Sequence, residues 1–122
     1  MAKIMVTCFE NPYGYGRIIE KNGIFYRIVE EKECSIEEKK IKKINCGIYV
    51  FNTDLLCKYL PLINNNNSQK EYYLTDIIEI IKNHEIINIG LYEVPPENQI
   101  EINGVNTQEQ LNELNQKYKH PI

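Results

Sequence analysis

Histidine and cysteine, the usual ligands of zinc, are scarce in this sequence. It contains only two histidines and four cysteines, and no two of the cysteines have the C-x-x-C spacing that is typical of zinc sites. These six residues are His84, His120, Cys8, Cys34, Cys46 and Cys57. The sequence therefore carries no zinc-site pattern, and we expect four free thiols in a reducing compartment.

Long hydrophobic runs are also missing. No segment approaches the length of a membrane span, and residues 1–10 lack the basic and apolar regions of a signal peptide. We therefore expect a cytoplasmic protein that does not bind membranes. The net charge of −3 and the pI near 5.4 argue against a protein that neutralises a nucleic-acid backbone. A small anionic ligand needs only local donors and is still possible.

The remaining composition is that of a single globular unit. With 122 residues, of which 43% are hydrophobic, the chain can bury one core and is too short for two ordinary domains. Apolar segments typical of strands alternate with amphipathic segments typical of helices. This order predicts an α/β fold with a mixed, mainly parallel sheet flanked by helices.

The expected elements can be given by residue range. Strands are predicted at 4–9, 17–20, 24–31, 44–52 and 86–94, and the Asn22-Gly23 pair predicts a hairpin. Helices are predicted from residue 35 to about 42, from 53 to 60, from 75 onward and from 107 onward, with a loop over residues 99–106. Capping boxes are expected at Ser35–Glu38 and Thr107–Gln110, while Thr53 with Asp54, and Thr75, are candidate caps of the other two helices.

The segment Asn11-Pro-Tyr-Gly-Tyr-Gly-Arg-Ile18 is the first candidate for a binding site. Glycine has no Cβ, so Gly14 and Gly16 can expose their N–H groups to a ligand that approaches the backbone closely. A pair of glycines in a hairpin or bulge would look the same. The octapeptide by itself does not distinguish these two interpretations.

Polar residues at the ends of predicted strands extend this candidate site. Gly16, Glu30, Asn45 and Asn106 all fall in or near loops beyond strand ends, where ligands of α/β sheets gather, so one pocket could contain them. Each also has a structural explanation. Glu30 could be a solvated charge and Asn45 part of a bulge, while Thr75 could be only a helix cap and Tyr73 only a packing residue.

Five segments of the chain together resemble a known family. They are Gly14-Tyr-Gly-Arg-Ile18, Ile28-Val-Glu30, Ile44-Asn45 with Gly47-Ile-Tyr49, Glu71-Tyr-Tyr-Leu-Thr-Asp76 and Gly104-Val-Asn106. Their order and spacing resemble the uridylyltransferase domain of bacterial N-acetylglucosamine-1-phosphate uridylyltransferases, whose fold is Rossmann-like. The resemblance spans about Ile4 to Tyr118 and corresponds to the second half of that domain. Residues 1–122 would thus form its sugar-binding, C-terminal part.

The resemblance implies roles for individual residues. Gly16 would offer its N–H to the sugar nucleotide, and Glu30 and Asn45 would hold the amino sugar through its hydroxyl and acetamido groups. Tyr73 and Thr75 would line the sugar pocket. Asn106 would share a Mg²⁺ ion with an aspartate from the first half of the domain, as an oxygen ligand suited to that cation. Arg17 is expected to be a structural or surface residue.

The implied reaction joins UTP and N-acetylglucosamine 1-phosphate into UDP-N-acetylglucosamine and pyrophosphate, without a covalent catalyst. The family's glycine-rich nucleotide loop, uracil-reading segment and metal aspartate have no counterpart in these 122 residues. These residues also contain no hexapeptide repeats, so we expect the acetyltransferase domain to be absent, and Cys46 stands where the family usually has threonine. We therefore expect the chain to be inactive alone and to require the missing nucleotide-binding half, in the same polypeptide or in a second chain.

Two alternatives stay open at this point. The chain could be a non-catalytic remnant or regulatory partner that binds a sugar nucleotide, or part of a related nucleotidylyltransferase that uses another hexose 1-phosphate. Because a strand begins almost at the first residue, a monomer would expose a sheet edge and apolar surface. Association is therefore expected, with the missing half or as a homo-oligomer.

Overall fold

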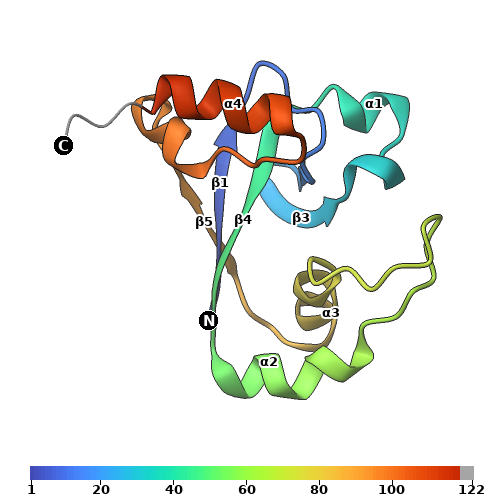
Figure 1. The fold of residues 1–122 in the computed structure, drawn as a ribbon. Coiled ribbons are helices and arrows are strands. Elements are labelled where there is room, and N and C mark those ends of the chain that lie inside the picture. Colours follow the sequence, from blue (N-terminus) through green and yellow to red (C-terminus); the bar gives the residue numbers. More distant parts are fainter. Residues whose placement is uncertain (119–122) are drawn as a thin grey trace.

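Five strands form one sheet in the computed structural model, which describes residues 1–118 (Figure 1). The strands are β1 (Ala2–Cys8), β2 (Arg17–Lys21), β3 (Ile24–Val29), β4 (Lys43–Phe51) and β5 (Ile89–Glu93), in the order β3-β2-β4-β1-β5. The predicted α/β class with a mixed sheet is confirmed.

The directions of the strands differ from the prediction of a mainly parallel sheet. Strand β1 pairs with β5 in parallel, but the β1–β4, β2–β3 and β2–β4 pairs are antiparallel. The prediction rested on the continuous apolar run of β1, which indicates burial on both faces. Burial of a strand does not determine the direction of its neighbours, and β4 returns alongside β1 in the opposite sense.

Short helical segments connect and flank the strands. They are η1 (Glu31–Glu33), α1 (Ile36–Lys39), α2 (Thr53–Tyr59), η2 (Leu60–Leu62), α3 (Asp76–His84), η3 (Pro96–Ile102) and α4 (Gln108–Lys117). Both predicted capping boxes are confirmed, at Ser35 with Glu38 and at Thr107 with Gln110. Helix α1 has four residues rather than about two turns, and the predicted loop over 99–106 begins with the 3₁₀ segment η3.

The caps of the two central helices differ from the prediction, that of α2 in its position and that of α3 in its hydrogen bonding. Asn52 caps α2, because its side chain accepts a hydrogen bond from the N–H of Leu55. Thr75 precedes α3 but makes no side-chain cap, and its backbone is already helical. Its hydroxyl is therefore available for a different contact, described below.

The β2–β3 hairpin turns at Asn22-Gly23, as predicted. Both residues have positive φ angles, 54° and 75°, which is the backbone geometry that favours asparagine and glycine in two-residue turns. In this hairpin Arg17 pairs with Val29, so the glycine loop, which ends at Arg17, lies next to the end of β3.

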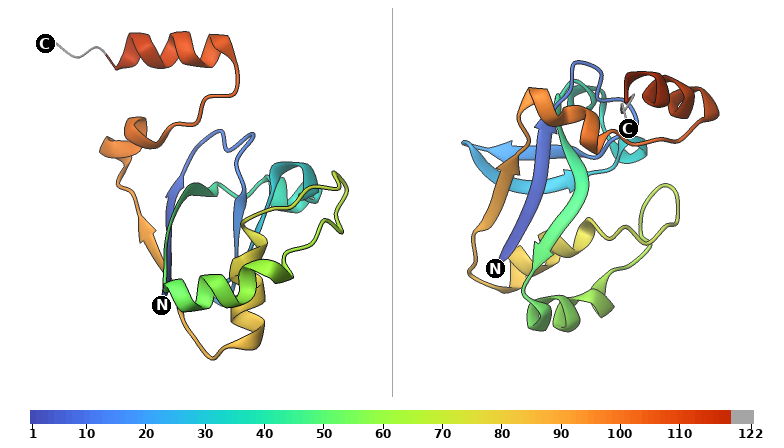
Figure 2. Two further views of the ribbon diagram at one scale, coloured as in Figure 1. Left: turned by 60° about the horizontal axis from the view of Figure 1, so that its bottom comes forward. Right: turned by 60° about the vertical axis from the view of Figure 1, so that its left-hand side comes forward.

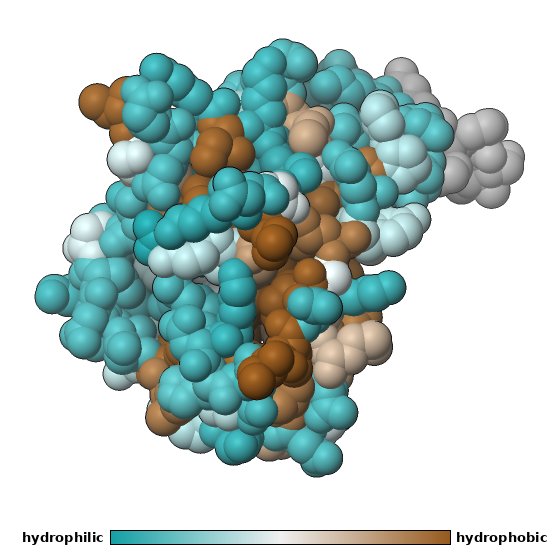
Figure 3. Space-filling model, turned by 180° about the vertical axis from the view of Figure 1, so that it is seen from behind, coloured by the Kyte–Doolittle hydropathy of each residue, from teal (hydrophilic) through white to brown (hydrophobic). Residues whose placement is uncertain are grey.

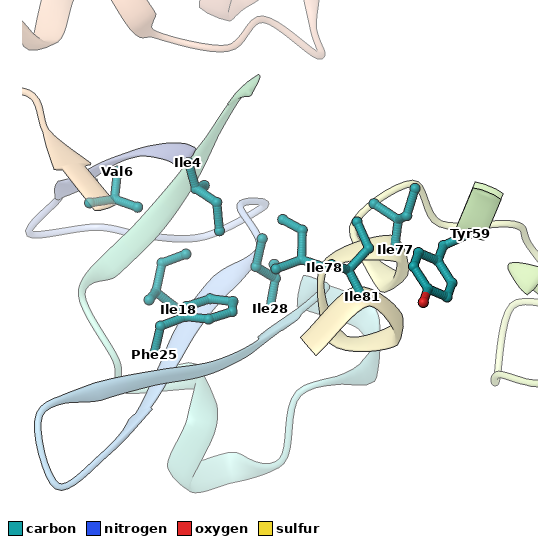
Figure 4. Packing of buried hydrophobic residues seen from close by; sticks show 9 residues of the cluster. All are labelled: Ile4, Val6, Ile18, Phe25, Ile28, Tyr59, Ile77, Ile78 and Ile81. Atoms are coloured by element: carbon teal, nitrogen blue, oxygen red, sulfur yellow. The ribbon is translucent and has the colours of Figure 1, made fainter. Parts of the chain in front are cut away.

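The core lies between the sheet and α3 (Figure 4). Isoleucines 77, 78 and 81 of α3 are fully buried and lie on one face of the helix. They meet buried apolar side chains from the first three strands and from α2, namely Ile4, Val6, Ile18, Phe25, Ile28 and Tyr59. Burial of this face fixes the start of α3, and with it Thr75, against the sheet.

Apolar side chains also remain on the surface. Figure 3 shows a band of hydrophobic residues on the side opposite the view of Figure 1. Exposed apolar residues in the strands include Ile48 and Val50 of β4 and Tyr92 of β5, each about half accessible to solvent. Within residues 1–118, no helix combines the length and the apolar character needed to cross a bilayer.

Candidate functional site

The glycine loop and the end of β3 meet at Gly16 and Glu30. A Cβ atom added to Gly16 would lie 3.5 Å from each carboxylate oxygen of Glu30 and 3.0 Å from the side chain of Ile28. The carboxylate of Glu30 thus rests directly against the backbone of the loop. A Cβ at position 16 would be in ordinary contact with this carboxylate but would crowd the side chain of Ile28, which gives a physical reason for glycine there.

Thr75 fixes the other side of this carboxylate. Its Oγ1 donates a hydrogen bond of 2.9 Å to Oε1 of Glu30, and Thr75 is only 7% exposed. A hydrogen bond to an ionised acceptor is stronger than one between neutral groups. Glu30 is therefore held in one orientation by residues from the loop and from the start of α3.

Asn45 lies next to Gly16 through the backbone. Its N–H donates a 2.9 Å hydrogen bond to the carbonyl of Gly16, at the point where β4 meets β2. Its buried side chain donates from Nδ2 to the hydroxyl of Tyr49 at 2.6 Å and accepts from the N–H of Gly47 at 3.0 Å. A carboxamide can make four hydrogen bonds, so one donor and one acceptor position are left for a ligand.

A surface pocket of about 390 Å³ opens in front of Glu30. Three of the predicted site residues, Glu30, Tyr73 and Asn106, line it together with Tyr13, Gly14, Glu31, Lys32 and Glu71. Gly16 and Thr75 do not line the pocket but both contact Glu30, as described above. The structure thus brings five predicted residues to one place, with Asn45 joined to them at Gly16.

Asn106 reaches the pocket from the loop between η3 and α4. Its Nδ2 is 4.0 Å from the position that a Cβ would take on Gly14, whose φ angle is +88°. The loop is joined to the glycine segment by Tyr15, whose hydroxyl accepts a 2.7 Å hydrogen bond from the N–H of Gly104. Two segments about 90 residues apart in the sequence therefore form adjacent walls of the pocket.

Arg17 stabilises the glycine loop and does not face the pocket. It is 2% exposed, donates to the carbonyls of Ile41 and Lys39 at 3.1 and 3.3 Å, and also donates to the carbonyl of Tyr15. Its guanidinium forms an ion pair of 2.5 Å with Glu31. The expectation that Arg17 is a structural residue agrees with this network, which leaves Lys32 as the cationic side chain lining the pocket.

Three carboxylates, those of Glu30, Glu31 and Glu71, line the pocket together with one cation, Lys32. Outside the pocket lining, burial raises the pKa of Tyr49; its hydrogen bond with Asn45 lowers this pKa, and the negative charge of Glu30 raises it to a smaller extent. Burial also raises the pKa of Asp76, and Glu79 and Glu30 add to this rise. A carboxylate wall accepts hydrogen bonds from neutral hydroxyl groups and repels phosphate, so it suits the polyol portion of a ligand.

Sequence reasoning did not single out four residues that line the pocket. Tyr13 belongs to the glycine octapeptide, Glu31 and Lys32 directly follow Glu30, and Glu71 begins one of the five family segments. A charge cluster at a strand end is most often ordinary surface, so the sequence carried no signal that Glu31 and Lys32 would face a pocket.

Known proteins resemble this chain closely over nearly its whole length, although no family model matches it. A probable UDP-N-acetylglucosamine pyrophosphorylase of Acanthamoeba polyphaga mimivirus is 48% identical over 113 residues, covering 90% of this chain and 44% of that protein. A protein named Bifunctional protein GlmU from Alkaliphilus metalliredigens is 47% identical over 122 residues, or 99% of this chain and 26% of that protein.

The fold also has a counterpart among solved structures. A putative glucose-1-phosphate thymidylyltransferase from Bacillus anthracis matches 77% of this chain and 35% of its own, with a TM-score of 0.55 and 20% identity. At this identity the likeness concerns the fold alone. The chain spans less than half the length of the curated relatives named above. The predicted resemblance is thereby confirmed: this chain is homologous to a part of proteins named UDP-N-acetylglucosamine pyrophosphorylase and GlmU.

Proposed function

We propose that this chain forms the sugar pocket of an enzyme that makes UDP-N-acetylglucosamine from UTP and N-acetylglucosamine 1-phosphate. The observation that carries the proposal is the carboxylate of Glu30, which Thr75 and Gly16 hold at the wall of a pocket that Asn106 also lines. The names of relatives 47–48% identical to this chain support the same activity.

Each polar residue has a task in this proposal. Glu30 accepts hydrogen bonds from sugar hydroxyls, and the free donor and acceptor positions of Asn45 bind the acetamido group. The N–H of Gly16 contacts the sugar nucleotide, while Tyr73 and Thr75 shape the pocket. Such groups reject analogues that leave them unpaired, because a buried polar group without a partner is costly.

The chemical step then depends on positioning rather than on a covalent catalyst. A phosphate oxygen of the sugar phosphate attacks the α-phosphorus of UTP. A new phosphorus–oxygen bond forms as the bond to the departing pyrophosphate breaks. The residues of this chain orient the sugar phosphate so that its oxygen faces that phosphorus.

Mg²⁺ is the cofactor that the proposal implies. Among residues 1–118, no three His, Cys, Asp or Glu side chains are grouped so that they could hold a metal. Asn106 fits the role of one oxygen ligand, since it is exposed at the pocket and its side chain lies beside Gly14. The remaining ligands would come from the substrate phosphates, water and another segment. When bound, Mg²⁺ neutralises phosphate charge.

A nucleotide-binding segment must complete the enzyme, in the same polypeptide or in a second chain. The relatives are two to four times as long as the part that this chain covers, which agrees with such a division. The exposed apolar side chains of β4 and β5 offer area for association with that segment or with a second copy.

The test is a pyrophosphate-release assay on this chain combined with the nucleotide-binding portion of the mimivirus relative. We expect turnover with UTP, Mg²⁺ and N-acetylglucosamine 1-phosphate, and at least tenfold lower kcat/KM in Glu30→Gln. The matched control Glu109→Gln changes an exposed residue of α4 and should leave turnover unchanged.

Other outcomes would replace the proposal with one of the alternatives. Higher kcat/KM with glucose 1-phosphate than with its N-acetylamino analogue would indicate a related nucleotidylyltransferase. Binding of UDP-N-acetylglucosamine without turnover in the combined protein would indicate a non-catalytic binding or regulatory role.

A further inference from the structure

The segment that carries Asn106 is weakly attached to the rest of the protein. Helix α4 buries no residue, and it projects from the body of the molecule on the loop that follows η3 (Figure 2). Inside this segment, Gln110 Oε1 accepts hydrogen bonds from the N–H groups of Asn106 and Thr107. Those bonds order the segment internally but do not place it against the sheet.

Within the described part of the chain, a single hydrogen bond links residues 103–117 to residues 1–102. It is the 2.7 Å bond from the N–H of Gly104 to the hydroxyl of Tyr15. No salt bridge or aromatic contact between residues 103–117 and residues 1–102 adds to it. The position of the loop beside the pocket therefore depends on where the Tyr15 hydroxyl lies.

Tyr15 is itself firmly placed. Its ring packs edge-on against Phe9, with centroids 5.2 Å apart and planes at 63°, and its carbonyl accepts from the buried Arg17. Its N–H donates to the carbonyl of Pro12 at 3.1 Å, which closes the turn of the glycine loop. Tyr15 lies between Gly14, which faces Asn106, and Gly16, which supports Glu30.

The fit around Gly104 is also close. A Cβ atom at this position would lie 3.2 Å from the Tyr15 hydroxyl oxygen. Glycine thus lets the loop approach the phenol until its N–H can donate. The contact joins a side chain of the glycine loop to the backbone two residues before Asn106.

We propose that Tyr15 is a positioning residue, whose hydroxyl tethers the 103–106 loop and thereby sets Asn106 at the pocket. The inference rests on the proposed function in one respect, namely that Asn106 is a ligand of Mg²⁺. Tyr15 itself touches neither the metal nor the sugar. Losing its hydroxyl should lower the apparent affinity for Mg²⁺ and leave the binding of the sugar almost unaffected.

The variant Tyr15→Phe tests this tether, because it keeps the ring contact with Phe9 and removes the acceptor. In the 122-residue chain, NMR hydrogen exchange should show the Gly104 amide exchanging about three- to tenfold faster, as expected for the loss of one hydrogen bond. The Asn45 amide, bonded to Gly16, should exchange at the wild-type rate and so report that the sheet is intact. Tyr92→Phe is the matched control, since the Tyr92 hydroxyl has no hydrogen-bond partner within the described part of the chain.

The functional consequence is measured in the protein completed with the nucleotide-binding portion. Tyr15→Phe should raise the Mg²⁺ concentration for half-maximal turnover about three- to tenfold, whereas the KM for the sugar phosphate should change less than twofold. An unchanged Gly104 exchange rate would overturn the tether. Faster Gly104 exchange with unchanged Mg²⁺ dependence would overturn the positioning role. If the wild-type protein shows no turnover, the proposed function fails, while the exchange measurement still decides whether Tyr15 holds the loop.

Discussion

Thr75 and Glu30 are 45 residues apart in the sequence and are joined by a 2.9 Å hydrogen bond from Oγ1 to Oε1. This bond connects the start of α3 with the end of β3. Because α3 is fixed by three fully buried isoleucines, the orientation of a carboxylate in the pocket is set by the packing of the core. Recognition and stability are thus coupled at Thr75.

The substitution Thr75→Val tests that coupling. Valine keeps the volume of threonine but cannot donate to Glu30, so we expect the KM for N-acetylglucosamine 1-phosphate to rise about tenfold. Steady-state kinetics on the completed enzyme measure this change. Thr53→Val, at an exposed position in the first turn of α2, is the control. An unchanged KM in Thr75→Val would show that Glu30 does not need this donor.

Asn45→Asp separates ligand recognition from structure at the neighbouring position. An aspartate can still accept from the N–H of Gly47, and the Tyr49 hydroxyl can donate to it, so the fold should persist. The variant loses the amide donor and brings a second negative charge close to Glu30. We expect kcat/KM for N-acetylglucosamine 1-phosphate to fall at least tenfold, and an unchanged value would reject Asn45 as a sugar ligand. Asn45→Ala should weaken amino-sugar use as well.

Replacing Arg17 should lower the stability of the fold. Arg17→Met removes three hydrogen bonds to carbonyls and leaves Glu31 without its cation, so the free energy of unfolding should fall by about 3 kcal/mol. Urea denaturation measures the loss. Lys40→Met breaks the exposed pair with Glu37 and should cost less than about 0.5 kcal/mol. Equal losses in the two variants would contradict the structural role of Arg17.

The reactivity of Cys46 should depend steeply on pH. Burial raises its pKa to about 11 from the ordinary 9.0, so its thiol is protonated at pH 8 and the reactive thiolate is rare. Mass spectrometry after iodoacetamide treatment at pH 8 should show Cys57, which is exposed, modified well before Cys46. Modification of Cys46 should accelerate as the pH rises toward 11. Rapid modification of Cys46 at pH 8 would show that this residue is not shielded.

The features that depend on neighbouring residues could be predicted from the sequence. The Asn22-Gly23 hairpin and the capping boxes at Ser35 and Thr107 are determined by a few adjacent residues, and the structure has all three. Strand direction could not be predicted, since the antiparallel β1–β4 pair joins segments about 40 residues apart. For the same reason the sequence suggested a cap at Thr75, whereas its distant partner is Glu30.

The candidate site, too, could be predicted from the sequence only in part. Its residue types and their positions at strand ends suggested a pocket, and the roles assigned to Gly16, Glu30 and Asn45 came from the family resemblance. Neither source could indicate that Lys32 lines the pocket or that Tyr15 bonds to Gly104, because these contacts depend on how separate loops meet in space.

The most direct measurement is an NMR titration. The ¹⁵N-labelled chain is combined with an unlabelled nucleotide-binding portion, and UDP-N-acetylglucosamine is then added stepwise. We expect the largest chemical-shift changes at the Gly16 amide and at the side-chain amides of Asn45 and Asn106. UDP-glucose, which lacks the acetamido group, should shift the Asn45 side chain much less. Shifts confined to residues outside this pocket, or equal shifts of Asn45 with both ligands, would contradict the central claim that this chain recognises the amino sugar.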